Sequence, residues 1–361
     1  MTTAGALWWF LGSDNALTKS HPDCILVFPR DPYADWARAT RTYLKEKYDV
    51  RAELEELHEN DPERDEVGLS ILSTEAKAII PFEVNVTEFI ASEMGNRTIL
   101  CRNSSTISNL NHKAKQISML SSPSIPQIPT LDLETCSASQ LCDFVSKTNN
   151  SKFIVKPSRG AGSLHQKVLT KDEVCGTMAR LISNKLWKKP AVIQPLIESK
   201  YSTIEFNLFV DNDEDLVWIA THSPGGLSEK NWEDGVILYP YEDKEDLEQI
   251  LSFVKSMIQR HELRGLLEFE FLKNHENDEL FLLEVNPRIS SSIVAFDAEG
   301  NSPYIDRLLV PYIRKLGVDV RNPAPSKDSS SSSSCKVWFP PELSAESYVK
   351  EQWCNNDGRS R

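Results

Sequence analysis

The sequence lacks the cysteine patterns that hold zinc or build a disulfide framework. Its seven cysteines are scattered, with no C-x-x-C pair and no Cys/His cluster at zinc-binding spacing. An odd, dispersed set of thiols is typical of a reduced protein of the cytosol. We therefore expect a cytoplasmic location, and we expect the cysteines to pack or to lie at the surface rather than to act as nucleophiles.

Positive charge is also scarce. The 361 residues contain 40 Lys and Arg against 53 Asp and Glu, which gives a formal net charge of −13. General nucleic-acid binding needs a basic surface, so we expect no nucleic-acid partner. A local basic pocket for a nucleotide is still compatible with this charge balance.

An apolar stretch near the start, residues 6–12 (ALWWFLG), is too short to cross a bilayer. It has no basic region before it and no clear small-residue cleavage site after it, so it does not read as a signal peptide. We expect a buried strand at this position and no membrane partner.

The length of the chain suggests two or three domains. Predicted strands at 24–29 and 77–81 alternate with predicted helices at 31–48 and 86–96, which favours an α/β unit with a mainly parallel sheet. The acidic run at 53–66 is expected to form a solvated helix or loop.

Three prolines within residues 121–131 predict an extended connection to a second segment. Helices are expected at 171–186 and 243–263. The stretch 326–336 is serine-rich and of low complexity, and we expect the tail that follows it to dock back on the body of the protein.

The glycine-rich stretch IVKPSRGAGS is neither a P-loop nor a dinucleotide-binding fingerprint, because Lys156 precedes Gly160 and Gly162. Small residues nevertheless let backbone N–H groups approach phosphate oxygens, and Lys156 would add a positive charge there. Taken alone, the stretch fits a plain β-turn with a surface lysine equally well.

Two strands, GLLEFEFL (265–272) and ELFLLEVN (279–286), predict a hairpin. Because side chains alternate along a strand, Glu268 shares a face with Glu270, and Glu284 shares one with Asn286. Hard oxygen ligands of this kind suit Mg²⁺. A solvated face of an antiparallel hairpin would carry the same pattern.

Four segments of the chain occur in the following order: NHKAKQISML, IVKPSRGAGS, AVIQPLI and EVNPRISSS. Together they resemble the ATP-grasp superfamily of the carbamoyl-phosphate synthetase and biotin carboxylase type, which includes amino-acid ligases. The resemblance covers roughly residues 75–315, and EVNPRISSS is its most specific piece.

The resemblance implies the α/β (α+β) fold class and a three-lobed architecture. The implied parts are a parallel-sheet N-terminal α/β lobe at 1–110, a small mobile lid with the glycine-rich loop at 111–197, a C-terminal catalytic lobe with an antiparallel sheet at 198–325, and a Ser-rich linker and tail at 326–361.

The resemblance also implies which residues bind ATP. Lys113 and Lys156 would contact the phosphates, and Gln194 would hold adenine together with the backbone of Leu196 and Ile197. The backbone of the loop over the phosphates would be supplied by Ser158, Gly160, Ala161, Gly162 and Ser163. Tyr201 stands where the family often has a glutamate for the ribose, so Glu198 and Glu205 are the candidate substitutes for that contact. Tyr201 and Glu205 are both counted among the residues expected to bind ATP.

The same resemblance assigns the metal and the substrates. Glu268, Glu284 and Asn286 would bind Mg²⁺, with Glu268 preferred to Glu270 because Gly265–Phe269 matches the family's G-x-x-E-F segment. Arg288 would stabilise the transferred phosphoryl group or an anionic intermediate. The residues expected beside the substrates are Glu83, Trp232, Ser290 and Ser291.

The implied activity is an ATP- and Mg²⁺-dependent ligase, with two Mg²⁺ ions that Mn²⁺ could replace. A small-molecule carboxylate would be activated as an acyl-phosphate and joined to an amine, with ADP and phosphate as products. Two alternatives stay open at this point, namely a carboxylase or other acyl-phosphate chemistry and a non-catalytic ATP-binding module. A homodimer is frequent among similar enzymes.

Overall fold

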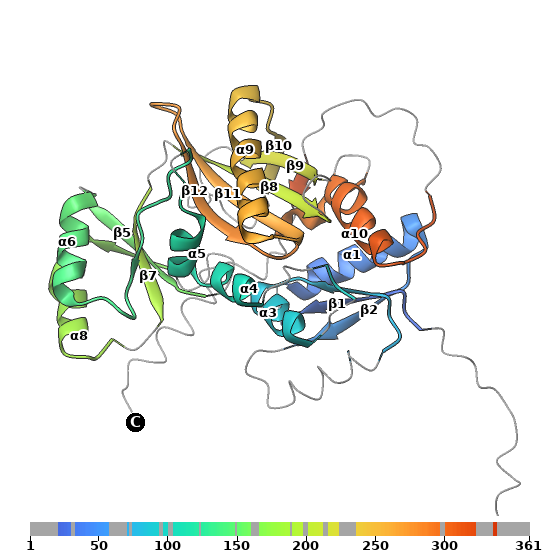
Figure 1. Ribbon diagram of the computed structural model, residues 1–361, viewed down its shortest axis with the longest axis horizontal. Coiled ribbons are helices and arrows are strands. Elements are labelled where there is room, and N and C mark those ends of the chain that lie inside the picture. The colour runs from blue at the N-terminus through green and yellow to red at the C-terminus, as the bar shows by residue number, and fades with distance from the viewer. Residues whose placement is uncertain are drawn as a thin grey trace, which may run out of the picture.

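In the computed structural model the strands of the described residues form three sheets, which Figure 1 shows side by side. The structure describes residues 21–29, 33–57, 71, 74–93, 97–99, 104–122, 124–148, 150–159, 166–187, 190–197, 201–211, 216–223, 236–296, 300–322 and 335–337. One sheet is parallel and the other two are built mainly of antiparallel pairs, so the predicted fold class is confirmed. The boundaries of the lobes stay predictions.

The first sheet is parallel and has the strand order β2-β1-β3. Its elements are β1 (Cys24–Phe28), α1 (Tyr33–Tyr48), β2 (Ala52–Glu56), β3 (Ala78–Pro81) and α3 (Val84–Glu93). All five residues of β1 are buried, as the apolar run predicts.

The prediction of a helix or loop for the acidic run was wrong at its beginning, because β2 occupies residues 52–56. Leu54 pairs with Leu26 of β1 and packs against the core, which fixes the register. Glu53 and Glu55 lie on this edge strand, where charged side chains discourage pairing with another chain. The acidic composition therefore marks a protected sheet edge.

The second sheet is antiparallel, with the strand order β4-β7-β5-β6. Its strands are β4 (Leu131–Asp132), β5 (Lys152–Pro157), β6 (Lys167–Thr170) and β7 (Ala191–Pro195). Its helices are α6 (Ala138–Thr148), α7 (Lys171–Glu173), the π-helix η1 (Val174–Met178) and α8 (Ala179–Ser183). Helix and sheet share a separate core that includes Leu141, Phe153 and Ile193, and Figure 1 shows this unit at one end of the molecule.

The third sheet has seven strands in the order β12-β11-β8-β9-β10-β14-β13. The strands are β8 (Tyr201–Val210), β9 (Leu216–Ser223), β10 (Val236–Pro240), β11 (Gly265–Asn274), β12 (Leu280–Asn286), β13 (Ala295–Phe296) and β14 (Cys335–Val337). The hairpin of β11 and β12 is confirmed. Strand β14, which spans the end of the serine-rich stretch and Val337, pairs with β10 and β13. The rest of the tail that was expected to dock on the body lies outside the described residues.

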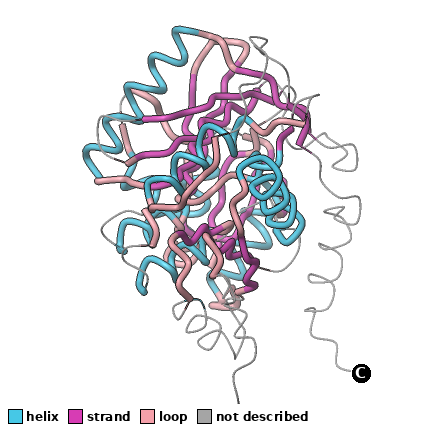
Figure 2. The backbone as a smooth tube through the Cα atoms, turned by 90° about the vertical axis from the view of Figure 1, so that its right-hand side faces the viewer, coloured by secondary structure: helices cyan, strands magenta, loops and turns pink. Residues whose placement is uncertain are grey.

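Helix α9 (Lys244–His261) covers one face of the seven-stranded sheet, where Phe253 packs edge-on against Phe269 and Phe271. Further helices in the described ranges are α4 (Ser104–Leu110), α5 (Lys113–Leu120), the 3-10 turn η3 (Ser291–Val294), the π-helix η4 (Ile305–Leu309) and α10 (Val310–Lys315). One hydrophobic core joins Leu26 and Ile80 of the parallel sheet to Leu266 of the seven-stranded sheet. Figure 2 shows strands through the middle of the molecule with helices around them.

Among the helices of the described ranges, none has both the length and the apolar character needed to span a bilayer.

A buried ion pair fastens α9 to β11. Lys273 Nζ lies 2.8 Å from Asp246 Oδ1, with side-chain exposures of 11% and 6%, and the Tyr241 hydroxyl also donates to Asp246. Asp246→Ala leaves a buried ammonium without its main acceptor, so we expect a loss of about 3 kcal/mol in the free energy of unfolding. Urea denaturation measures this loss.

The control for this prediction is Arg38→Ala. Arg38 forms an exposed pair with Asp35, with side-chain exposures of 57% and 47%. Such pairs contribute less than about 1 kcal/mol. Equal losses in the two variants would contradict the prediction.

Candidate active site

Strands β8, β11 and β12 place six polar side chains on one face of the seven-stranded sheet. Glu268 pairs with Asn207 on one side and Asn286 on the other, and two residues further along, Glu270 pairs with Glu205 and Glu284. Side chains two apart on a strand share a face. We call this set the carboxylate grid, and its members are Glu205, Asn207, Glu268, Glu270, Glu284 and Asn286.

The two rows of the carboxylate grid differ in exposure. The row of Asn207, Glu268 and Asn286 is buried. The row of Glu205, Glu270 and Glu284 keeps partial exposure. The second row is therefore the one that a ligand in solution can reach.

Burial, together with neighbouring negative charge, raises two of the pKa values in the carboxylate grid. Burial, followed by the charge of Glu268, raises the pKa of Glu205 to about 7. Burial, followed by the charges of Glu284 and Glu268, raises the pKa of Glu270 well above its ordinary value. Each carboxylate would ionise more readily if a cation lay beside it.

Glu284 behaves in the opposite way because two lysines approach it. Burial works to raise its pKa, but Lys113, Lys156, a hydrogen bond from Asn286 and the charge of Arg288 outweigh burial and lower the pKa to about 2. The Nζ atom of Lys113 on α5 lies 4.0 Å from Glu284 Oε2. Burial and the neighbouring Lys113 lower the pKa of Lys156, against the opposing effect of Glu284 and Glu270.

Asn286 lies at the centre of the carboxylates. Its Nδ2 atom donates to Glu268 Oε2 at 3.1 Å, to Glu284 Oε1 at 3.1 Å and to Glu270 Oε1 at 3.3 Å. The partly positive amide hydrogens thus occupy the place between carboxylates that suits a cation. Rotation of the amide would bring its oxygen there instead, and carboxylate and amide oxygens are ligands that Mg²⁺ accepts.

Within the part of the chain that the structure describes, no three His, Cys, Asp or Glu side chains already surround one metal position. The donor set that fits Mg²⁺ is therefore two carboxylates and one amide oxygen. The remaining ligand positions suit water and phosphate, which Mg²⁺ commonly keeps.

Arg288 is bound to the buried row. Its Nη1 atom donates to Glu268 Oε2 at 2.8 Å and to the carbonyl of Ile289 at 3.0 Å. Ser290 Oγ donates to the other oxygen of Glu268 at 2.5 Å, and Ser292 Oγ donates to Glu205. Both oxygens of Glu268 are thus engaged by the protein, which leaves Glu270 as the more available neighbour of Glu284.

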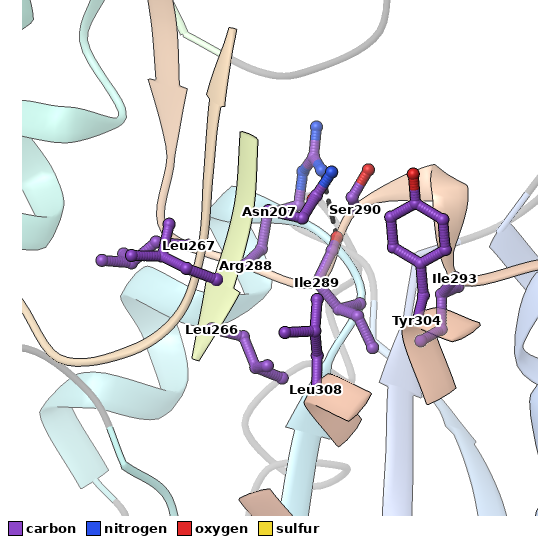
Figure 3. A pocket seen from close by; sticks show the side chains of 10 residues that line it. Asn207, Leu266, Leu267, Arg288, Ile289, Ser290, Ile293, Tyr304 and Leu308 are labelled. Atoms are coloured by element: carbon purple, nitrogen blue, oxygen red, sulfur yellow. Dashed lines mark hydrogen bonds between the residues drawn. The ribbon is translucent and has the colours of Figure 1, made fainter. Parts of the chain in front are cut away.

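A small cavity lies beside this arginine. Asn207, Arg288 and Ser290 place their polar ends on one side of it, and apolar side chains such as Leu266 and Leu308 line the other (Figure 3). Ser290 also caps η3 by accepting a hydrogen bond from the N–H of Ser292 at 3.1 Å. The turn after β12 therefore holds the arginine and the serines over the carboxylate grid.

The residues expected around adenine already have partners in the protein. Gln194 on β7 is buried and donates from Nε2 to Thr130 Oγ1 at 2.8 Å. The N–H of Leu196 donates to the carbonyl of Lys152 at 3.0 Å. Adenine binding by this N–H would need an exchange of partners.

Ser158 follows β5 and lies beside the lysine-bearing helix, because its carbonyl accepts the N–H of Lys113 at 2.8 Å. Its buried Oγ has no hydrogen-bond partner among the described residues. The other predicted loop residues, Gly160, Ala161, Gly162 and Ser163, lie outside the described residues, as do Glu198, Trp232 and the side chain of Ser291.

Two of the predicted residues lie away from the carboxylate grid. Tyr201 pairs with Asn274 at the far end of β11, and its hydroxyl accepts from Asn274 Nδ2 at 3.3 Å. Glu83 caps α3, since its Oε2 atom accepts from the N–H groups of Asn85 and Val86 at 2.7 and 3.3 Å. An ATP contact for Tyr201 and a substrate contact for Glu83 stay predictions.

Sequence reasoning missed the place of Glu205 and Asn207 in the carboxylate grid. A signal for them exists, because Glu205-x-Asn207 repeats the spacing of Glu284-x-Asn286. That spacing puts a carboxylate and an amide on one face of a strand in both cases.

Comparison with known proteins agrees with this arrangement. A family model described as an ATP-grasp domain matches residues 110–292, which is just over half of the chain. A search of the curated proteins finds no match.

Several solved structures share the fold at low sequence identity. N5-carboxyaminoimidazole synthetase from Staphylococcus aureus is 12% identical, with 87% of this chain and 93% of that chain covered and a TM-score of 0.56. Biotin carboxylase from Campylobacter jejuni is 15% identical, with 88% and 74% covered and a TM-score of 0.56. D-alanyl-alanine synthetase A from Vibrio cholerae is 13% identical, with 74% and 89% covered and a TM-score of 0.52.

The matched segment runs from α5, which carries Lys113, to the turn after β12, which carries Arg288, and so contains every described member of the carboxylate grid. The chain belongs to the ATP-grasp family.

Proposed function

We propose that this protein is an ADP-forming ligase that activates a carboxylate with ATP and joins it to an amine. The observation that carries the proposal is the place of Lys113 Nζ 4.0 Å from Glu284 in the carboxylate grid, where the charge of Lys156, from a different structural unit, also lowers the pKa of Glu284. Lysines next to carboxylates form a site with separate places for phosphate and for its metal ion. Synthetases are also among the proteins with a similar fold.

In the proposed reaction, a carboxylate oxygen of the substrate attacks the γ-phosphorus of ATP, and ADP leaves. The amine nitrogen then attacks the acyl carbon of the acyl-phosphate, phosphate leaves, and the amine gives up a proton. Lys113 and Lys156 bind and orient the phosphates. Arg288, held by Glu268, stabilises negative charge that develops at the acyl centre.

The carboxylate grid would hold Mg²⁺ through Glu284, Asn286 and a second carboxylate, either Glu268 or Glu270. When bound, Mg²⁺ supplies positive charge that offsets the charge of the phosphates. Two such ions, replaceable by Mn²⁺, are part of the proposal. Ser290 and Ser291 lie in the turn that would face the second substrate.

A second candidate is carboxylation, with bicarbonate in place of an organic carboxylate. The cavity beside Arg288 is small, which suits a small anion. Two proteins of similar fold are a carboxylase and a carboxyaminoimidazole synthetase by name. Dependence of phosphate release on bicarbonate would separate this candidate from the ligase.

The first prediction from the proposed function concerns activity. With ATP, Mg²⁺ and a panel of carboxylate and amine pairs, phosphate release should occur only with a matching pair, and Glu284→Gln should lower it by on the order of 100-fold or more. The control is Glu279→Gln, because Glu279 is an exposed carboxylate at the turn of the same hairpin. If the protein bound ATP but released no phosphate with any pair, the result would favour a non-catalytic ATP-binding module instead of a ligase.

The second prediction separates Glu268 from Glu270. Glu268 is engaged by Arg288 and Ser290, whereas Glu270 belongs to the more exposed row beside Glu284. We expect Glu270→Gln to raise the Mg²⁺ concentration needed for half-maximal ATP binding by about 10-fold. We expect Glu268→Gln to lower kcat with a smaller change in that concentration, and the reverse result would restore Glu268 as the metal ligand.

The third prediction concerns pH. The pKa of Glu284 is about 2 against an ordinary value of 4.5, so its ionisation stabilises the fold above pH 4.5, and this stabilisation is lost as the pH falls through 2. Lys113→Met removes one cause of the low pKa, so the acid-induced loss in the free energy of unfolding should be smaller than in the wild type. Lys115→Met is the control, because Lys115 is exposed on the same helix. If the free energy of unfolding depended on pH in the same way in the wild type, Lys113→Met and Lys115→Met, the prediction would be contradicted.

A further inference from the structure

The outer edge of β12 needs hydrogen-bond partners. This strand lies at the end of the seven-stranded sheet, so the backbone groups that point away from β11 meet no further named strand. Backbone groups on a covered edge must be satisfied by other parts of the chain. Near the start of the strand, the N–H of Leu282 donates to the carbonyl of Pro126 at 2.9 Å, and Leu282 in turn accepts from the N–H of Ile128 at 3.3 Å.

Val285 lies between Glu284 and Asn286, and its backbone groups form hydrogen bonds with a side chain instead of with another strand. Its N–H donates to Gln116 Oε1 at 3.1 Å, and its carbonyl accepts from Gln116 Nε2. The same Nε2 atom donates to the carbonyl of Leu110 at 2.8 Å. The side-chain amide of Gln116 thus takes the place that the backbone of a neighbouring strand would fill.

Gln116 is buried, with 4% exposure, and it lies one turn after Lys113 on α5. Residues three apart lie on the same side of a helix. The side of α5 that carries the predicted phosphate-binding lysine therefore also carries the amide that holds the strand of Glu284 and Asn286. Figure 1 shows α5 next to β12.

We propose that Gln116 is a positioning residue of the Mg–ATP site, and this inference rests on the proposed function. By pairing with both backbone groups of Val285, Gln116 fixes the distance between Lys113 on the helix and the carboxylate of Glu284 on the strand. That distance sets how phosphate and metal ion are held with respect to each other, and small displacements of such groups have large effects on binding and rate.

Other contacts keep the helix in place when this amide is removed. Leu120 of α5 is buried in the same core as Phe269 and Val285, and Met119 packs against that core. Loss of the hydrogen bonds should therefore loosen the alignment of α5 on β12 without releasing the helix. A purely structural role would lower stability alone, whereas a positioning role also alters the effect of Mg²⁺ on nucleotide binding.

The test uses Gln116→Met, which has a similar length but cannot form these hydrogen bonds. The control is Gln249→Met, because exposed Gln249 on α9 also donates to a backbone carbonyl, that of Ser124, which belongs neither to β12 nor to the carboxylate grid. Calorimetry measures the affinity for ATP with Mg²⁺ and with EDTA, at a temperature where every variant is folded. A second series repeats the measurement after adding Glu284→Gln to each protein.

For Gln116→Met we expect the affinity with Mg²⁺ to fall by about 10-fold, as when a residue that orients a metal ligand is lost. The affinity in EDTA should change less than about 2-fold. Adding Glu284→Gln to Gln116→Met should lower the affinity with Mg²⁺ only a little further, because a metal ligand and the residue that positions it act as a unit. Gln249→Met should match the wild type in all four measurements. Gln116→Asn has a side chain one carbon shorter and should show the same differences in affinity with smaller magnitudes. It replaces Gln116→Met in the experiment if Gln116→Met does not fold.

Two results would overturn the inference in different ways. Wild-type affinities in Gln116→Met or Gln116→Asn, with only the melting temperature lowered, would make Gln116 a structural residue and leave the proposed function intact. Failure of the wild-type protein to bind Mg–ATP would remove the proposed function and this inference together.

Discussion

The site depends on one electrostatic constraint, namely that four carboxylates share one face of a sheet. Glu205, Glu268, Glu270 and Glu284 lie on three adjacent strands, and the nearby cations are Lys113, Lys156 and Arg288. Among the described side chains negative charge therefore exceeds positive charge, and this excess adds to burial, the larger cause, in raising the pKa values of Glu205 and Glu270. A surface of this kind is stable only if other parts of the chain bring cations to it.

This requirement explains why the site is also a junction between structural units. Lys113 comes from α5, which is fixed to β12 through Gln116, so its distance from Glu284 is set locally. Lys156 comes from β5 in the four-stranded sheet, which has a core of its own. Any movement of that sheet relative to the seven-stranded sheet must change the Lys156–Glu284 interaction. The charge balance and the relative position of the two sheets are thus linked.

The sequence was sufficient for the elements with local signals. Alternation placed Glu284 and Asn286 on one face, and the apolar runs located β1, β7 and the β11–β12 hairpin. It was not sufficient for Glu205, because the pairing of β8 with β11 joins residues about sixty positions apart, and a register shift of one residue would turn the side chain to the other face. The same holds for β2, whose acidic composition conceals a strand that tertiary pairing imposes.

Glu205 and Glu284 show why residue identity alone could not define the chemistry. Each is a glutamate two positions before an asparagine, each lies on a strand beside β11, and each faces Glu270. Yet the pKa is about 7 for Glu205, where burial and Glu268 dominate, and about 2 for Glu284, where Lys113 and Lys156 overcome burial. The lysines lie outside the seven-stranded sheet, on elements distant in sequence. The difference that keeps Glu284 ionised near pH 7 and leaves Glu205 only about half ionised there is therefore a property of the assembled fold.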